Sequence, residues 1–495
     1  MEIFTNLASG LDVVLHPTVL FYCFLGALLG TAIGVLPGIG ALAAISLLLP
    51  VTYHLSSIEA LVMLAGVFYG TMYGGAIASI LLNLPGTATS AVTCLEGHPL
   101  AKQGKAGLAL STSMVSSFLG SMIGLFVLLL FAPIISEWGL KFGPADYFAM
   151  MVLGLLAAST IGQGSVAKTL AMVVVGMLLG TVGTDVASGV SRFDFGAVPL
   201  MDGISIVVLA MGVFGISEVI NSINRPSQST AYSLNLKSLL PSRAEVKRSF
   251  FPVMRGGGIG SVLGALPGTG AAIASFIGYA VEKKVSKHPE RFGKGAIEGV
   301  ASPESANNAA AITAFVPTLT LGIPGDVVMA LMLGAMILHG IQPGPMMISE
   351  HPEMFWGLIV SFGVGSFMLL ALNLPLIAVW VRLLKIPFSY LYPAIIVFVC
   401  LGVYSVKNST FEIMMVALVG GLGYGMHVLR FSPAPLILGF VLGPMIEENL
   451  KRSLMLSNGD LSVFIARPIS GTFVAVSVLL ILYSISKVFF KRKKL

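Results

Sequence analysis

Two copies of one glycine-rich motif carry the residues of this chain that are best suited to bind a small ion. The copies are Gly30–Ala41 and Gly260–Ala271, 230 residues apart, and each contains a Pro-Gly break inside a long apolar run. The helix before such a break ends in free carbonyls with partial negative charge, and the helix after it begins with free N–H groups of partial positive charge. One break can therefore hold a carboxylate and a cation close together without a buried formal charge.

The first pair of breaks supplies five candidate substrate-binding residues, which are Gly38, Gly40, Gly268, Thr269 and Gly270. Glycine has no side chain, so substrate oxygens can approach its backbone closely, and threonine adds a hydroxyl group. The alternative is that these glycines only permit close packing of helices, as an isolated Gly-x-x-x-Gly motif does. The duplication of the motif and the inserted proline favour the binding role.

A second break follows the first in each half of the chain, with the shared pattern Leu-x-x-Pro-Gly. The copies are Leu82–Thr87 and Leu321–Asp326, so the order of breaks is the same in both halves. Interrupted hydrophobic segments at matching places in two halves indicate the binding site of a secondary transporter. The substrate-binding candidates from these breaks are Asn83, Gly86, Thr87 and Gly325.

Asp326 has two interpretations that we weigh equally. It is suited to be the N-cap of a helix over residues 327–338. It is also an acid at membrane depth, where carboxylates are rare and usually functional, and it could bind Na⁺ or a proton. The coupling-ion candidates are Asn83, Thr269, Asn308 and Asp326, and Na⁺ is the one metal ion that the sequence suggests.

The run Glu298–Ala309 carries two more candidates. Its Ser-Pro-Glu pattern predicts a helix start with Ser302 as N-cap and Glu304 in the first turn. That role does not explain the adjacent Asn307 and Asn308, which stand at the entry to an apolar helix. Because buried amides need hydrogen-bond partners, we expect both asparagines to lie on the path of the substrate or the ion.

Composition places the chain in a membrane. Of 495 residues, 56% are hydrophobic and 10% are charged, and apolar runs long enough to span a bilayer recur along the sequence. The net charge of +6 comes from a few short basic loops and does not suggest nucleic acid. Three cysteines without metal-ligand spacing and the absence of catalytic motifs predict neither a cofactor nor an enzyme.

We expect one integral membrane domain over residues 1–495, with all-α architecture and about 10 to 12 transmembrane segments. Its parts are a first repeat half (18–220), a cytoplasmic connector (221–250), a second repeat half (251–450) and a last transmembrane helix (468–490) with a basic cytoplasmic tail.

Basic residues predict the topology of the segment around the second copy of the glycine-rich motif, Gly260–Ala271. Lysine and arginine are abundant both before Pro252 and after Glu282, so both flanks should be cytoplasmic. The segment between them fits two short helices and therefore a re-entrant hairpin, with a single kinked span as the alternative. The matching first hairpin has flanks without lysine or arginine, which suits the opposite face and an inverted repeat.

Five motifs resemble the large membrane subunit of the tripartite tricarboxylate transporter family, over nearly the whole chain. These motifs are Gly34–Gly40, Tyr73–Thr87, Glu96–Gly104, His288–Gly295 and Glu298–Ala309. The resemblance implies uptake of tricarboxylates such as citrate, or of related carboxylates, by symport driven by an ion gradient.

The same resemblance implies a small four-helix membrane subunit and a periplasmic solute-binding protein. From the composition and the basic tail we expect a bacterial inner membrane with the C-terminus in the cytoplasm. A homodimer is left open. The alternative functions are the large subunit of a TRAP-type dicarboxylate transporter and, with less support, an anion channel, which lacks a visible filter motif here.

Overall fold

The computed structural model describes residues 2–36, 38–161, 165–185, 188–222, 239–384 and 388–492. Pro37 of the first break and most of the predicted connector, residues 223–238, lie outside the described residues. Within the described ranges, helices form nearly all of the regular structure, and the strands are the antiparallel pair β1 (Gly183–Thr184) and β2 (Ser191–Arg192). The prediction of an all-α protein is confirmed.

The helices before residue 223 are α1 (Glu2–Leu15), α2 (Pro17–Val35), α3 (Ala41–Thr52), α4 (Ser57–Leu82), η1 (Thr89–Ala91), α5 (Thr93–Lys102), α6 (Ala106–Gly139), α7 (Pro144–Ile161), α8 (Val166–Gly180), η2 (Val198–Leu200), α9 (Ile206–Ala210), the π-helix η3 (Met211–Ile216) and α10 (Ser217–Ser222). The helices after residue 239 are α11 (Arg243–Gly264), α12 (Gly270–Val285), η5 (Pro289–Arg291), α13 (Glu298–Thr313), α14 (Phe315–Leu321), α15 (Val327–Leu338), α16 (Met347–Glu350), α17 (Pro352–Asn373), α18 (Ile377–Leu383), α19 (Phe388–Lys407), α20 (Thr410–Val428), α21 (Ala434–Leu456), α22 (Val463–Ala466) and α23 (Pro468–Arg492).

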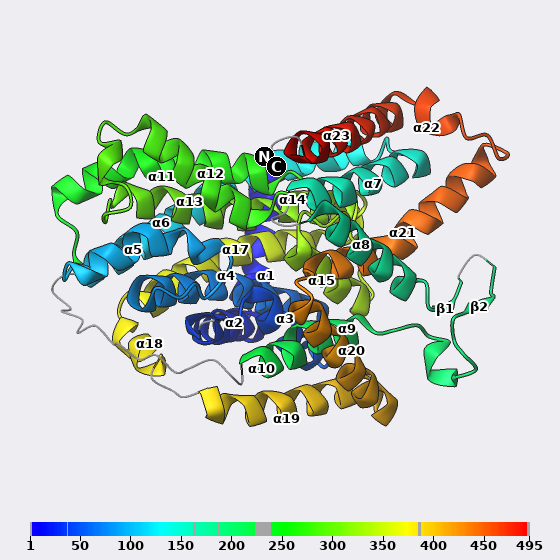
Figure 1. The fold of residues 1–495 in the computed structure, drawn as a ribbon, viewed down its shortest axis with the longest axis horizontal. Helices are drawn as coiled ribbons and strands as arrows, with labels where there is room; N and C mark the ends of the chain where they lie inside the picture. The colour runs from blue at the N-terminus through cyan, green and yellow to red at the C-terminus, as the bar shows by residue number, and fades with distance from the viewer. Residues whose placement is uncertain are drawn as a thin grey trace.

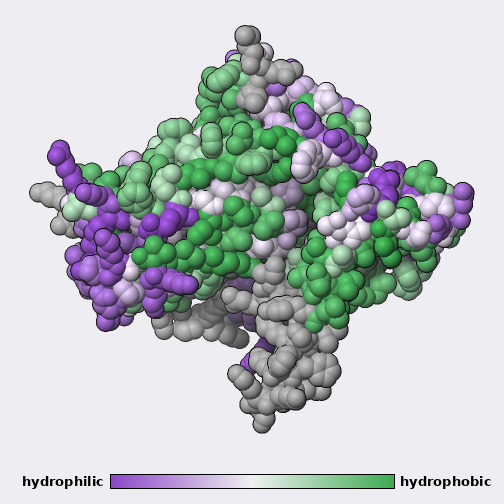
Figure 2. Space-filling view, turned by 90° about the horizontal axis from the view of Figure 1, so that it is seen from above, coloured by the Kyte–Doolittle hydropathy of each residue, from purple (hydrophilic) through white to green (hydrophobic). Residues whose placement is uncertain are grey.

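Five helices in the described part of the chain are long and apolar enough to cross a membrane, namely α2, α4, α6, α17 and α20. Shorter apolar helices accompany them. Most helices run along the longest axis of the molecule (Figure 1). Figure 2 shows a broad hydrophobic surface between two hydrophilic ends along the same axis. Both observations fit a polytopic membrane protein whose helices run roughly along the bilayer normal.

Glycine stripes hold the helices of each hairpin against the helix that follows it. In the first half, α2 packs on α4 with Gly26 against Met63, Gly30 against Val67 and Gly34 against Thr71. In the second half, α11 packs on α13 with Gly256 against Ser302, Gly260 against Ala306 and Gly264 against Ala310. A Cβ atom at any of these glycines would lie within 2.6 Å of a backbone oxygen, so only glycine permits this distance between helices.

These contacts repeat at constant offsets. The glycines of α11 lie 230 residues after those of α2, and their partners on α13 lie 239 residues after those on α4. The second breaks share the offset of 239, because Asn83 and Gly322 both end their helices in the left-handed region, at φ 57° and 68°. The repeat seen in the sequence is therefore also a repeat of packing.

Contacts near the two ends of the long helix α6 show that the two hairpins open toward opposite ends of the molecule. At its N-terminal end, Gln103 Nε2 donates to the Lys294 carbonyl over 2.8 Å, in the loop that follows the second hairpin. At its C-terminal end, Ser136 Oγ donates to the Pro345 carbonyl over 2.7 Å. Pro345 belongs to the turn after α15. In the same turn, the His339 carbonyl accepts a 3.5 Å hydrogen bond from the hydroxyl of Ser57, which lies beside the open end of the first hairpin. The repeats are inverted, as expected.

The second hairpin consists of two antiparallel helices, as a re-entrant hairpin requires. Helices α11 and α12 are antiparallel, and the Arg255–Glu282 ion pair of 2.7 Å joins them near their open end. Helix α11 is longer than expected because it begins at Arg243, with a capping box formed by Ser242 and Glu245. Its polar first turns lie outside the apolar part of the hairpin, so the break still falls at residues 265–269.

Candidate functional site

The tip of the second hairpin packs directly onto the second break of the same half. Gly268 has φ +87° and donates its N–H to the Gly325 carbonyl over 2.7 Å. The Thr269 hydroxyl donates to the Leu263 carbonyl and, over 3.0 Å, to that of Leu266. Two breaks that are far apart in sequence thus form one structural unit, and Thr269 satisfies carbonyls that the end of α11 leaves free.

A cavity of about 460 Å³ lies at this unit, and we name it the Gly268 cavity. The hairpin contributes Gly268, Thr269 and Gly270 to its wall, and the second break contributes Asp326. Helices α7, α8 and α21 and the turn before α21 close the other sides with Ala158, Thr169, Ser432, Ala434, Pro435 and Leu438. The volume is in the range that small-molecule sites occupy.

Two helix N-termini face the Gly268 cavity. Helix α12 begins at Gly270 and helix α15 at Val327, and both residues line the cavity. Their first N–H groups have no intrahelical acceptors and carry partial positive charge, which favours an anion. Asp326 is the one ionisable side chain among the residues that form the wall. An anion bound there therefore meets helix dipoles and a single carboxylate.

Asp326 is the N-cap of α15, which confirms one of its two interpretations. Its Oδ1 accepts the Met329 N–H over 2.9 Å. Its other oxygen, Oδ2, would lie 3.7 Å from a Cβ atom placed on Gly270, so the carboxylate also borders the hairpin tip. Capping and cavity lining are both properties of this residue.

The first half reaches the same cavity through its second break. Ala88 and Ala91 line the wall, and Ser275 of α12 donates its hydroxyl to the Thr89 carbonyl over 3.0 Å. Thr87 lies behind this wall, with its hydroxyl 2.8 Å from that of Thr89. Three of the four breaks therefore meet around the Gly268 cavity.

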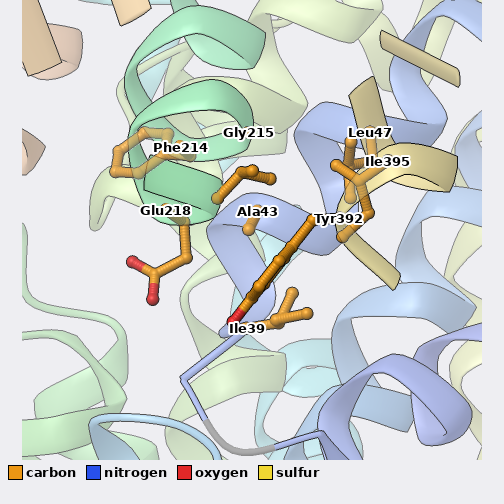
Figure 3. A pocket seen from close by; sticks show the side chains of 9 residues that line it. Ile39, Ala43, Leu47, Phe214, Gly215, Glu218, Tyr392 and Ile395 are labelled. Atoms are coloured by element: carbon orange, nitrogen blue, oxygen red, sulfur yellow. The ribbon is translucent and has the colours of Figure 1, made fainter. Parts of the chain in front are cut away.

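The tip of the first hairpin borders a separate space, the Ile39 cavity, with a volume of about 10 Å³. Ile39 and Ala43 line it at the positions equivalent to Thr269 and Ile273 of the Gly268 cavity. Figure 3 shows the Tyr392 ring directed toward Ile39, with the Glu218 carboxylate across from it. The two hairpin tips thus border equivalent spaces, and among the described residues the one at the second tip is large enough for a small carboxylate.

The structure separates the predicted binding residues into several groups. Gly268, Thr269, Gly270 and Asp326 line the Gly268 cavity, and Gly325, Gly86 and Thr87 are buried next to its wall. Gly38 and Gly40 belong to the other tip, where Gly40 is the N-cap of α3 and a Cβ atom there would meet no atom within 4 Å. Asn83 is exposed and is absent from the wall of the Gly268 cavity, so its clear role is the left-handed helix end.

Asn307 and Asn308 lie inside the protein rather than at the cavity wall. Each is 1% exposed. Asn308 Nδ2 donates to the Glu304 backbone carbonyl over 3.0 Å, whereas its Oδ1 has no partner among the described residues. Neither amide atom of Asn307 has a hydrogen-bond partner there. Buried amides that stay unsatisfied in the protein itself are unusual.

The predicted helix start at Ser302 is wrong. Helix α13 begins four residues earlier, at Glu298, and the Ser302 hydroxyl donates to the Gly278 carbonyl of α12 over 3.0 Å. Glu304 is consequently a mid-helix residue and is 1% exposed. The sequence pattern resembled a cap because serine, proline and glutamate are also typical of a first turn, and only the contact with α12 excludes that reading.

Glu96 is a structural residue that the sequence analysis missed. Its carboxylate is fully buried and accepts the N–H groups of Gly293, Gly295 and Ala296, the last two over 2.8 Å. The Tyr279 hydroxyl adds a fourth hydrogen bond of 2.8 Å. Two motifs of the sequence, around Glu96 and around Gly293, therefore bind each other across nearly 200 residues of chain. The sequence singled out both segments as motifs, but nothing in it indicated that they contact each other.

Comparison with known proteins gives a consistent result. The sequence pattern of the Tripartite tricarboxylate transporter TctA family matches residues 20–438. The "Uncharacterized 52.8 kDa protein in TAR-I ttuC' 3'region" of Agrobacterium vitis is 47% identical over 478 residues, which cover 97% of this chain and 95% of that protein. The "Uncharacterized protein in TAR-II ttuC' 3'region" of the same organism is 50% identical over 226 residues, 46% of this chain and 93% of that protein.

No solved structure matches the chain. The family pattern nevertheless spans both hairpins and all four breaks. With that coverage, and with a relative of 47% identity along almost the whole length, the chain belongs to the tripartite tricarboxylate transporter TctA family.

Proposed function

We propose that this chain is the large membrane subunit of a secondary transporter that takes up tricarboxylates or related organic carboxylates, driven by an ion gradient. The observation that carries the proposal is the Gly268 cavity, where the N-termini of α12 and α15 meet at two broken helices. Such breaks are tolerated at membrane depth where they line a cavity, and transporters use them to bind ions. Family membership adds the substrate class.

The chemistry that we propose at this cavity is binding without covalent steps. Free N–H groups at the starts of α12 and α15 hold the substrate carboxylates, and the small residues of the tip let them approach. Asp326 and the carbonyls near Thr269 hold a coupling cation, which offsets the charge of Asp326 next to the anion. Asn83 and Asn308 remain weaker coupling-ion candidates. The protein acts as a transporter and not as an enzyme.

The domain organisation that we propose follows the inverted repeat. Halves 18–220 and 251–450 surround the cavity, connector 221–250 is cytoplasmic, and helix 468–490 ends in a basic cytoplasmic tail. Basic residues gather where the second hairpin opens, which supports a cytoplasmic assignment of that end in a bacterial inner membrane. The partners are a small four-helix membrane subunit and a periplasmic solute-binding protein, as the family name "tripartite" suggests.

Uptake into proteoliposomes tests this function. The chain, co-purified with its small membrane subunit, is reconstituted, and radiolabelled citrate or another carboxylate is added with the solute-binding protein. We expect accumulation above equilibrium that needs both the binding protein and an imposed Na⁺ or proton gradient. Passive flux that needs neither would instead support an anion channel.

A further inference from the structure

Glu304 is a buried carboxyl group that the substrate cavity does not use. It lies on α13, is 1% exposed and is absent from the wall of the Gly268 cavity. The Thr93 hydroxyl of α5 donates to its Oε1, and the Ser117 hydroxyl of α6 donates to its Oε2 over 3.0 Å. No arginine, lysine or histidine of the described residues forms an ion pair with it.

The surroundings of Glu304 hold further polar atoms without partners. Asn308, one turn along the same helix face, has an unsatisfied Oδ1, and Tyr73 OH also has no hydrogen-bond partner among the described residues. Ser113 Oγ lies within reach of a weak hydrogen bond to the Glu304 carboxylate, and Tyr73 is close enough to interact with it electrostatically. Several unsatisfied polar atoms around one carboxyl group indicate a site that exchanges a small species rather than a finished structural network.

The repeat supplies an independent argument. At the offset of 239 residues, the counterpart of Glu304 in the first half is Ala65, and the counterparts of Asn307 and Asn308 are Phe68 and Tyr69. Both helices pack on their hairpins through the same glycine contacts. The architecture therefore needs no carboxyl group at this position, and a buried acid that it does not need is expensive to keep.

We propose that Glu304 carries a proton that is coupled to carboxylate uptake, in addition to the cation proposed at Asp326, and this proposal rests on the proposed function. Protonation forms one O–H bond on the carboxylate and removes its charge, and release of the proton on the other side of the membrane restores the carboxylate. Thr93 and Ser117 suit this exchange because hydroxyl groups both donate and accept. Both donate to the carboxylate, and one rotates to accept the O–H of the carboxylic acid.

The other titratable groups on the elements packed against Glu304 are already committed or neutral. Glu96 is held by the loop after the second hairpin, and Arg255 is paired with Glu282. The buried or half-buried titratable groups on these elements include Tyr69 and Tyr73 on α4, Cys94, Glu96 and His98 on α5, Arg255 on α11, and Tyr279 and Glu282 on α12. Lys102, Arg248, Lys283 and Lys284 on the same elements are exposed. A change of charge at Glu304 is therefore not compensated by a neighbouring ion pair.

The test compares Glu304→Gln with wild type and with Glu298→Gln, a matched control at the start of the same helix whose carboxylate pairs with Arg248 over 2.8 Å near the surface. Glutamine keeps the hydrogen bonds but cannot release a proton. In proteoliposomes with the partner proteins, we expect Glu304→Gln to exchange citrate across the membrane but to lose accumulation driven by a proton gradient. Glu298→Gln should retain both.

Accumulation by Glu304→Gln at the wild-type level would overturn the proposal. So would wild-type uptake that depends on Na⁺ and not on pH, or loss of exchange as well as accumulation in a folded, monodisperse Glu304→Gln, since that would assign Glu304 to substrate binding. Infrared difference spectroscopy of the purified protein during pH titration tests the carboxyl group itself. We expect a protonated-carboxyl band that Glu304→Gln lacks, and its absence from the wild type would also overturn the proposal.

The infrared measurement needs no transported substrate. If the wild type transports no carboxylate substrate, the proposed function fails. The presence or absence of the infrared band still decides whether Glu304 takes up a proton.

Discussion

Asp326 combines at one residue two roles that are often separate. As the N-cap of α15 it satisfies the Met329 N–H, and as a wall residue of the Gly268 cavity it places a carboxylate beside the start of α12. The cap explains why an acid is tolerated at this depth, and the cavity gives the acid access to a ligand. A substitution that keeps the cap and removes the charge separates the two roles.

We predict that Asp326→Asn leaves stability within about 0.5 kcal/mol of wild type, because asparagine and aspartate cap helices equally well. If the charge binds the coupling cation, the apparent affinity for that cation falls roughly tenfold or more, which corresponds to about 1.4 kcal/mol. Thermal unfolding and the ion dependence of uptake measure the two effects. Asp326→Ala is the comparison, and it should also lose about 1 kcal/mol of stability. Unchanged ion dependence in Asp326→Asn would assign the residue to capping alone.

Glu96 is a residue whose role depends on contacts with residues far away in the sequence. The sequence identified the glycines of the breaks, the cap at Asp326 and the buried asparagines, because each depends on neighbours within a few residues. The partners of Glu96 lie at residues 293–296, and those of Glu304 lie on α5 and α6. No local pattern contains such distant contacts, so the sequence placed Glu304 at a helix start and assigned Glu96 no role of its own.

We predict that Glu96→Ala destabilises the protein by on the order of 3 kcal/mol, because three backbone N–H groups and the Tyr279 hydroxyl lose a buried carboxylate. Thermal unfolding in detergent measures the loss. Glu290→Ala is the control in the same loop, since its side chain is 64% exposed and pairs only with His288 in the described structure. Equal unfolding temperatures for Glu96→Ala and Glu290→Ala would show that the carboxylate does not hold the loop.

At the scale of elements, each hairpin is held by a stripe of glycines rather than by large side chains. The α2 and α11 stripes let backbones approach to distances at which dispersion and weak Cα–H···O contacts stabilise helix pairs in a membrane. Sequence alone favoured a binding role over packing for the duplicated motif. That binding role was predicted for the tip glycines, and Gly268 and Gly270 do line the cavity, whereas Gly30, Gly34, Gly260 and Gly264 pack helices.

Helix α11 offers a matched pair of glycines for testing this division. A Cβ atom on Gly260 would lie 2.1 Å from the Ala306 carbonyl oxygen, whereas a Cβ atom on Gly258 would meet no atom within 4 Å. We predict that Gly260→Ala destabilises by about 2 kcal/mol or more, and that Gly258→Ala is neutral or stabilises by up to about 1 kcal/mol. Thermal unfolding of both variants decides. Two equally stable variants would contradict the close packing of α11 on α13.

At the scale of the whole molecule, the inverted repeat places two equivalent hairpins in opposite directions. In the described part of the chain, the second hairpin borders a space of about 460 Å³, against about 10 Å³ at the first. A transporter with alternating access needs such a difference in volume between the two cavities. In its other state, the larger cavity would lie at the first hairpin. The duplicated breaks predicted the repeat and the basic flanks predicted its inversion, but the difference in cavity size depends on the positions of α7 and α19, which no motif describes.

Because the two hairpins open in opposite directions, cysteines beside them should be labelled from opposite faces of the membrane. In a cysteine-free background, Lys287→Cys beside the second hairpin should react with a membrane-impermeant maleimide from the cytoplasmic face only. His54→Cys beside the first hairpin should react from the periplasmic face only, and both native side chains are exposed. Inside-out and right-side-out vesicles provide the comparison. Reaction of both cysteines from one face would contradict the inverted arrangement.

The central claim is that a carboxylate binds in the Gly268 cavity, and substrate protection of a single cysteine tests it most directly. Ala88→Cys places a thiol in the wall of this cavity, and His54→Cys places one at the open end of the first hairpin as a control. The account predicts that transported carboxylates slow maleimide labelling of Ala88→Cys in a saturable way and leave His54→Cys unaffected. Labelling of Ala88→Cys that no transported carboxylate slows, in a variant that still takes up substrate, would contradict it.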